Sequence, residues 1–248
     1  MIVPDGKGSR TNRPGSLSAT ATLRGWGAWG VTVGSSGSTP TFGAPARSAT
    51  SYGVCFKCHS SYVALGGRPD LAREFDPANA SLHSVEGNST STVPAGTFVG
   101  GWTSTSAMYC TDCHGDDGGG AQARDLHQSA SAPILSKPYL GVAPDDPRLL
   151  CYSCHRRDVY ATESADAGLS GFVTASGAEH LHVVHVGPPA SSGHGLGCDA
   201  CHVTHGSVTQ PHLLRDDIGF TSTGAHAGSC TNACHDAGIG GGTRAYGS

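Results

Sequence analysis

Ten cysteines fall into five pairs, and a histidine follows the second cysteine of every pair. The cysteines are Cys55 and Cys58, Cys110 and Cys113, Cys151 and Cys154, Cys198 and Cys201, and Cys230 and Cys234. The histidines are His59, His114, His155, His202 and His235. C-x-x-C-H is the attachment signature of c-type haem, in which both thiols bind the porphyrin and the imidazole binds iron. The sequence therefore predicts five covalently attached haem c groups.

Two other uses of paired cysteines compete with haem. An even cysteine count in an exported protein is compatible with a disulfide framework, and C-x-x-C pairs also hold structural zinc. Neither use requires a histidine at a fixed offset. With 14 histidines among 248 residues, five specified positions are all histidine by chance roughly once in a million cases. The histidines thus favour haem, although the fifth motif, CTNACH, has three residues between Cys230 and Cys234 instead of two.

Each iron then needs a second axial ligand, which decides between electron transfer and substrate binding. Methionine can serve two irons at most, because the chain contains only Met1 and Met108. Nine histidines lie outside the motifs. We predict five of them as distal ligands: His83, His127, His182, His185 and His205. The other four, for which we predict no iron, are His180, His194, His212 and His226.

The spacing of the spare histidines supports this choice. His83 and His127 are each alone in the interval between two motifs. His205 follows the fourth motif by three residues, too close to reach the far side of its own haem but able to reach a neighbouring one. The third motif has no spare histidine before His180. We therefore expect its second ligand to come from residues 180–206 or from another subunit.

The secondary structure of residues 179–186 decides which histidines act together. In a helix, successive residues turn by about 100°, so His182 and His185 share a face and His180 points away. In a strand, His180 and His182 share a face instead. We favour the helix, because one face then offers two imidazoles to two neighbouring haems.

The composition predicts a fold with little ordinary core. Glycine accounts for 37 residues, and only 6% of the chain is aromatic, so the apolar area that could offset the entropy of ordering is small. We predict mostly irregular coil with short helices and a few short strands around five haems. Residues 1–50 form a haem-free extension with a β-hairpin over Thr20–Val33, residues 51–248 hold the haems, and a short helix covers Pro69–Phe75.

Charge and hydropathy exclude some partners. The formal net charge is -4 and only 14% of residues are charged, so there is no basic stripe of the kind that binds nucleic acid. No apolar run reaches the length of a membrane span. Covalent haem attachment takes place outside the bacterial cytoplasm, so we expect an exported protein whose signal peptide was removed. The expected location is extracellular or at the cell surface, with the periplasm as the alternative.

Several segments resemble the outer-surface multihaem cytochromes of metal-respiring bacteria. These are CHVTHGS followed by HLLR, YGVCFKCHSS, REFDPANASLHSVEG and LHVVHV. The resemblance implies an irregular fold around a row of haems with two histidines on each iron. It also implies extracellular electron transfer, in some members through conductive filaments.

Three functions are therefore compared. The first is an extracellular electron conduit that polymerises into a filament, with other cytochromes as donor or acceptor and metal oxides or electrodes as terminal acceptors. The second is a soluble electron shuttle. The third is a multihaem reductase with an open coordination site on one haem, which nothing in the sequence requires, so we do not expect an enzyme.

Overall fold

The computed structural model describes residues 52–56, 59, 69–91, 93–115, 134–191, 193–224, 227–231, 235 and 244–246. The predicted hairpin at Thr20–Val33 and the rest of residues 1–50 lie outside this part, as do Cys58, His127, His226 and Cys234. The boundary at residue 50 and the wrapping of the chain around haems stay predictions.

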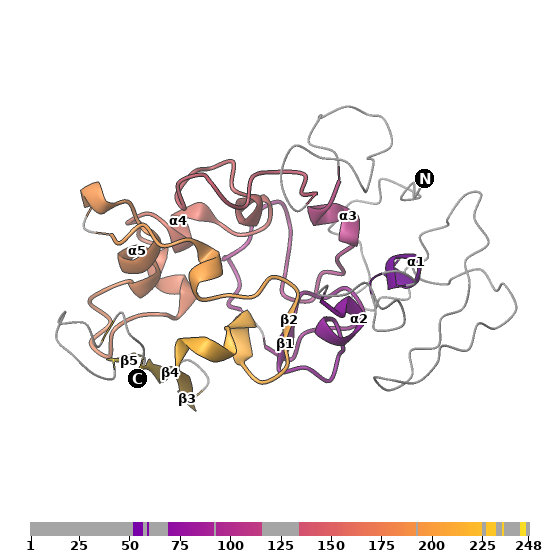
Figure 1. Cartoon of the computed structure of the whole chain (residues 1–248). Helices are drawn as coiled ribbons and strands as arrows, with labels where there is room; N and C mark the ends of the chain where they lie inside the picture. The colour runs from indigo at the N-terminus through magenta and orange to yellow at the C-terminus, as the bar shows by residue number, and fades with distance from the viewer. Residues whose placement is uncertain are drawn as a thin grey trace, which may run out of the picture.

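All elements of the described chain are short, and irregular segments join them (Figure 1). The α-helices are α1 (Tyr52–Phe56), α2 (Leu71–Glu74), α3 (Cys110–Cys113), α4 (Arg157–Tyr160) and α5 (Leu181–Val186). The 3-10 helices are η2 (Leu150–Ser153), η3 (Ala167–Ser170), η4 (Pro189–Ser191), η5 (Cys198–Ala200), η6 (Pro211–Leu213) and η7 (Asp216–Ile218). The strands are β1 (Ser81–Leu82), β2 (Gly206–Ser207), β3 (Phe220–Gly224), β4 (Ala227–Cys230) and β5 (Arg244–Tyr246).

Helix α2 confirms the short helix predicted near Pro69–Phe75 and helps to form a small core. The side chain of Asp70 caps its start by accepting a hydrogen bond from the N–H of Arg73, as short polar side chains commonly do. Its apolar residues pack into a buried cluster with Phe56 and Val85. Met108 packs against this cluster as well.

Two antiparallel sheets connect distant parts of the chain. Strands β1 and β2 pair with Ser81 opposite Ser207 and Leu82 opposite Gly206. Strands β3, β4 and β5 form a separate sheet in that order. The β1–β2 pair is therefore a bridge between the segment after the first motif and the segment after the fourth.

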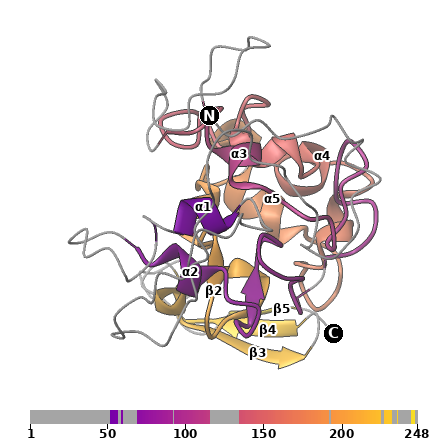
Figure 2. The same ribbon diagram turned by 90° about the vertical axis from the view of Figure 1, so that its right-hand side faces the viewer.

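Helices α1, α2 and α3 lie toward one end of the described chain, and α4, α5 and the β3–β4–β5 sheet lie toward the other (Figure 1). Figure 2 views the molecule from the first end, with α1 and α2 in front. Within the described residues, no helix combines the length and the apolar character that a membrane crossing requires.

Candidate haem-binding sites

Four of the five C-x-x-C-H motifs adopt the same local structure, a single helical turn. In each, the N–H of the histidine donates to the carbonyl oxygen of the first cysteine. The bonds run from His59 to Cys55 (2.9 Å), His114 to Cys110 (2.8 Å), His155 to Cys151 (2.9 Å) and His202 to Cys198 (2.9 Å). Residues at positions i, i+3 and i+4 of a turn share one side of the helix. In the second, third and fourth motifs the turn therefore brings both thiols and the imidazole to one side.

Three motifs are also held by a segment from elsewhere in the chain, which we call the clasp. Its central residue forms an isolated antiparallel bridge with the motif histidine: Leu135 with His114, Phe98 with His155, and Leu214 with His202. Two backbone hydrogen bonds flank each bridge. In the third motif, for example, Val99 N–H donates to Cys154 O (2.8 Å) and Arg156 N–H donates to Thr97 O (2.9 Å). The clasp thus fixes the backbone position of the motif histidine.

In two clasps the backbone is strained where it meets the motif imidazole. Ile134 has a φ of 63° and His212 a φ of 54°, a left-handed conformation that residues other than glycine rarely adopt. Their carbonyl oxygens accept hydrogen bonds from the Nδ1 of His114 (3.2 Å) and of His202 (2.9 Å). Such strain is concentrated at functional sites. Here it orients carbonyls toward the motif histidines.

The imidazoles of four motif histidines each lie opposite one spare histidine. The separations of the ring centroids are 6.2 Å for His114 and His205, 6.5 Å for His155 and His83, 6.3 Å for His202 and His182, and 6.2 Å for His235 and His185. All four spare histidines were predicted as distal ligands. The fifth predicted distal ligand, His127, lies outside the described residues and stays a prediction.

These separations match what a six-coordinate haem iron requires. An iron bound to one nitrogen of each imidazole at about 2 Å, with a ring radius of about 1.2 Å, separates the centroids by about 6.4 Å. A pair of imidazoles is also the number of protein ligands that such an iron takes, since the porphyrin supplies the other four. In the separation of their rings and in their number, the four histidine pairs therefore fit haem iron. Within the described residues, no group of three or more histidine, cysteine or acidic side chains is arranged around a common metal position.

Hydrogen bonds at Nδ1 leave the other ring nitrogen available for iron. The Nδ1 of His83 donates to Thr204 O (2.6 Å), that of His185 to Leu181 O (2.6 Å), and that of His205 to the carboxylate of Glu74 (2.7 Å). Haem-ligating histidines bind iron through Nε2, and a partner at Nδ1 fixes both the tautomer and the ring orientation.

Burial favours the neutral form of several paired imidazoles. It lowers the pKa of His155 and of His182 to about 3, because the charged form is poorly solvated in the interior. Burial also lowers the pKa of His83 and of His202. A neutral imidazole carries the nitrogen lone pair that iron ligation needs.

Cysteines of neighbouring motifs meet in two places. Hydrogen bonds join the thiols of Cys55 and Cys110, and those of Cys151 and Cys198. The shared hydrogen bond, together with burial, raises the pKa of Cys110 and of Cys151. None of these four residues is part of a disulfide. The contacts place motif one beside motif two and motif three beside motif four.

The pairing differs from the expectation in one respect. We expected the second ligand of the third motif to come from residues 180–206 or from another subunit, but the ring opposite His155 belongs to His83. The β1–β2 pair places the backbone of His83 beside that of His205, and from this position the ring of His83 faces the third motif while that of His205 faces the second. Proximity in the sequence was therefore a poor guide to which motif His83 serves.

Helix α5 confirms the helical alternative for Leu181–Val186, while residues 179 and 180 of the predicted helix lie outside it. His182 and His185 share a face, and the ring of Phe172 packs against both, with centroid distances of 5.1 Å and 5.7 Å. His180 lies at the N-cap, outside the helical turn. One face of α5 thus presents imidazoles to the fourth and fifth motifs.

His194 lies closer to this group than the sequence suggested. Its ring centroid is 6.1 Å from that of His185, almost the same distance as His235 on the fifth motif. The N–H of His194 donates to Val184 O on α5 (2.9 Å), which holds it beside the helix. His194 is therefore a second candidate partner for His185.

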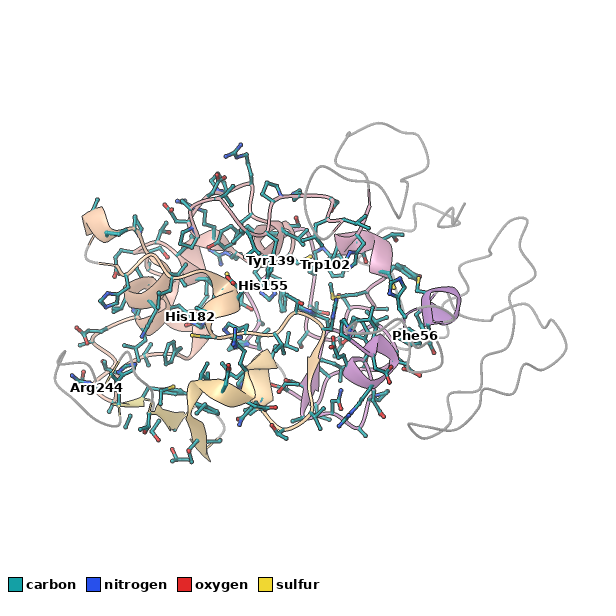
Figure 3. The ribbon with its side chains drawn as sticks, in the orientation of Figure 1. Phe56, Trp102, Tyr139, His155, His182 and Arg244 are labelled. Atoms are coloured by element: carbon teal, nitrogen blue, oxygen red, sulfur yellow. The ribbon has the colours of Figure 1, made fainter. Side chains whose placement is uncertain are left out.

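Aromatic side chains fill the space between successive histidine pairs. Tyr160 contacts the ring of His155 (5.5 Å) and that of His182 (5.0 Å), edge to face in both cases. Figure 3 shows His155 and His182 between Phe56 at one end of the molecule and Arg244 at the other. The pairs therefore follow one another across the molecule.

No protein-family model matches this chain, and neither a curated protein nor a solved structure does so.

Proposed function

We propose that this protein binds five haem c groups and transfers electrons along them. The observation that carries the proposal is the set of four histidine pairs, each of which joins one C-x-x-C-H histidine to one spare histidine at 6.2 to 6.5 Å. Haem bound in this way supplies a one-electron couple between ferric and ferrous iron. The four histidine pairs would hold four of the five irons from both sides.

The order of the pairs supports transfer across the molecule. The pair at His114 adjoins the pair at His155, because the N–H of His83 donates to His205 O over 2.9 Å. Tyr160 connects the pairs at His155 and His182. Phe172 connects those at His182 and His185. Electron tunnelling falls steeply with distance, so neighbouring sites of this kind suit transfer from donor to acceptor.

Covalent haem content tests the proposal. Mass spectrometry of the protein produced in a host with the haem-attachment machinery should show five haem additions, and the ferric protein should have a low-spin absorption spectrum. A chain that carries no haem, or that binds zinc through the same cysteines, would contradict the proposal. A high-spin component that binds carbon monoxide after reduction would instead favour a reductase with an open coordination site.

We further propose an extracellular conduit that polymerises, which is what the resemblance to outer-surface multihaem cytochromes implies. The donors and acceptors are other cytochromes, with metal oxides or electrodes as terminal acceptors. Electron microscopy of the native haem-loaded preparation should show fibres. A preparation that stays monomeric at high concentration would favour the soluble shuttle.

A further inference from the structure

His205 differs from other paired histidines in the chemistry of its hydrogen-bond acceptor. Its Nδ1 lies 2.7 Å from Oε2 of Glu74, an anionic carboxylate. The corresponding nitrogens of four other paired histidines bond backbone carbonyls instead. These histidines are His83, His114, His185 and His202.

The chain holds Glu74 firmly in this position. Glu74 is the last residue of α2, and the buried amide of Asn79 donates to its carbonyl oxygen over 2.8 Å. The backbone of Gly206, next to His205, packs directly against the same carbonyl oxygen. The carboxylate thus reaches His205 from an anchored backbone and not from a loose surface side chain.

We propose that Glu74 is a positioning residue that lowers the reduction potential of the haem attached to the second motif, whose His114 lies opposite His205. The inference rests on the proposed function. A carboxylate that accepts the Nδ1 proton increases the basicity of the imidazole. A more basic ligand, with a negative charge nearby, stabilises ferric iron relative to the ferrous form that results when one electron is added.

Solvent limits the size of the effect. The side chains of His205 and Glu74 are 24% and 33% exposed, so water screens part of the charge. We expect removal of the charge to change the redox equilibrium constant of this haem by about threefold to tenfold. Tenfold corresponds to a positive shift of about 59 mV for one electron.

The test is a spectropotentiometric titration of haem-loaded Glu74→Gln beside the unaltered protein. Glutamine keeps an oxygen acceptor of the same reach but removes the charge, so the spectrum should stay low-spin while one of the five midpoint potentials rises. Glu163→Gln is the matched control, because Oε2 of Glu163 lies 3.4 Å from Nδ1 of His180, which no described motif histidine faces. The control makes the same change in net charge and should leave the potentials in place.

Two further outcomes separate the possibilities. Glu74→Asp retains the carboxylate and should restore much of the lower potential. This variant also provides the comparison if Glu74→Gln yields too little protein. A haem-loaded Glu74→Gln with unshifted potentials, or with the shift that Glu163→Gln produces, would overturn the inference and leave the proposed function intact. An unaltered protein without covalent haem would overturn both.

Discussion

His83 and His205 lie side by side just beyond the two registered residue pairs of the β1–β2 ladder, where the N–H of His83 donates to the carbonyl oxygen of His205 over 2.9 Å. Their rings serve different motifs, since His83 faces His155 and His205 faces His114. A two-residue antiparallel ladder therefore places the second ligands of two proposed haems next to each other. This relationship gives the first prediction.

Replacement of His83 by alanine should leave the haem of the third motif five-coordinate. About one fifth of the haem should become high-spin and bind carbon monoxide after reduction, because an open axial position accepts exogenous ligands. Electron paramagnetic resonance of the ferric protein measures the high-spin fraction. His180→Ala is the control and should remain low-spin. A six-coordinate spectrum in His83→Ala would show that another side chain binds this iron.

Two variants distinguish the partners of His185. If His185 and His235 bind the same iron, His185→Ala should produce a high-spin haem, whereas His194→Ala should not. The physical reason is that His235 belongs to a haem-attachment motif and His194 does not. The same resonance spectra provide the measurement. A high-spin signal in His194→Ala would assign the ligand to His194 instead.

Replacement of Gly206 by alanine should destabilise the protein and disturb the second motif. A Cβ at this position would overlap the carbonyl oxygen of Glu74, and relief of such overpacking costs about 1–3 kcal/mol. The midpoint of urea unfolding, followed by circular dichroism, should fall accordingly. Gly224→Ala is the matched control, because its Cβ would meet the Cβ of Ala227 at an ordinary 3.7 Å. Equal losses in both variants would contradict a specific contact at Gly206.

Acidification should lower the stability of the haem-loaded protein between pH 6.5 and pH 3. In the absence of iron, the folded-state pKa values of His155 and His182, about 3, lie below the ordinary value of 6.5, so only the unfolded chain takes up protons in this window. Their contribution is fully present above pH 6.5 and falls by about 1.4 kcal/mol per pH unit for each histidine. Iron ligation acts in the same direction, because iron and the proton compete for the same lone pair.

Urea unfolding at several pH values measures this dependence. A stability that stays flat from pH 6.5 to pH 4 would contradict the prediction.

The sequence alone determined the motifs and most of the local structure around them. The C-x-x-C-H motif consists of neighbouring residues, so it can be recognised without knowledge of the fold. The helix at Leu181–Val186 and the turn at Leu71–Glu74 also followed from local spacing and end signals. We chose His83, His182, His185 and His205 from the number of spare histidines and their positions between the motifs. In the structure, each of their rings lies opposite a motif histidine.

Only the tertiary structure decided which ring faces which motif. The ladder that carries His83 to His155 pairs residues more than a hundred positions apart, and the clasps at Phe98, Leu135 and Leu214 are single-residue bridges without a periodic pattern. The contact between Glu74 and His205 has the same origin. Such contacts depend on backbone pairing between distant segments in a chain with little apolar core. They therefore cannot be predicted from local sequence patterns. The sequence therefore specified the candidate ligands, and the fold specified their partners.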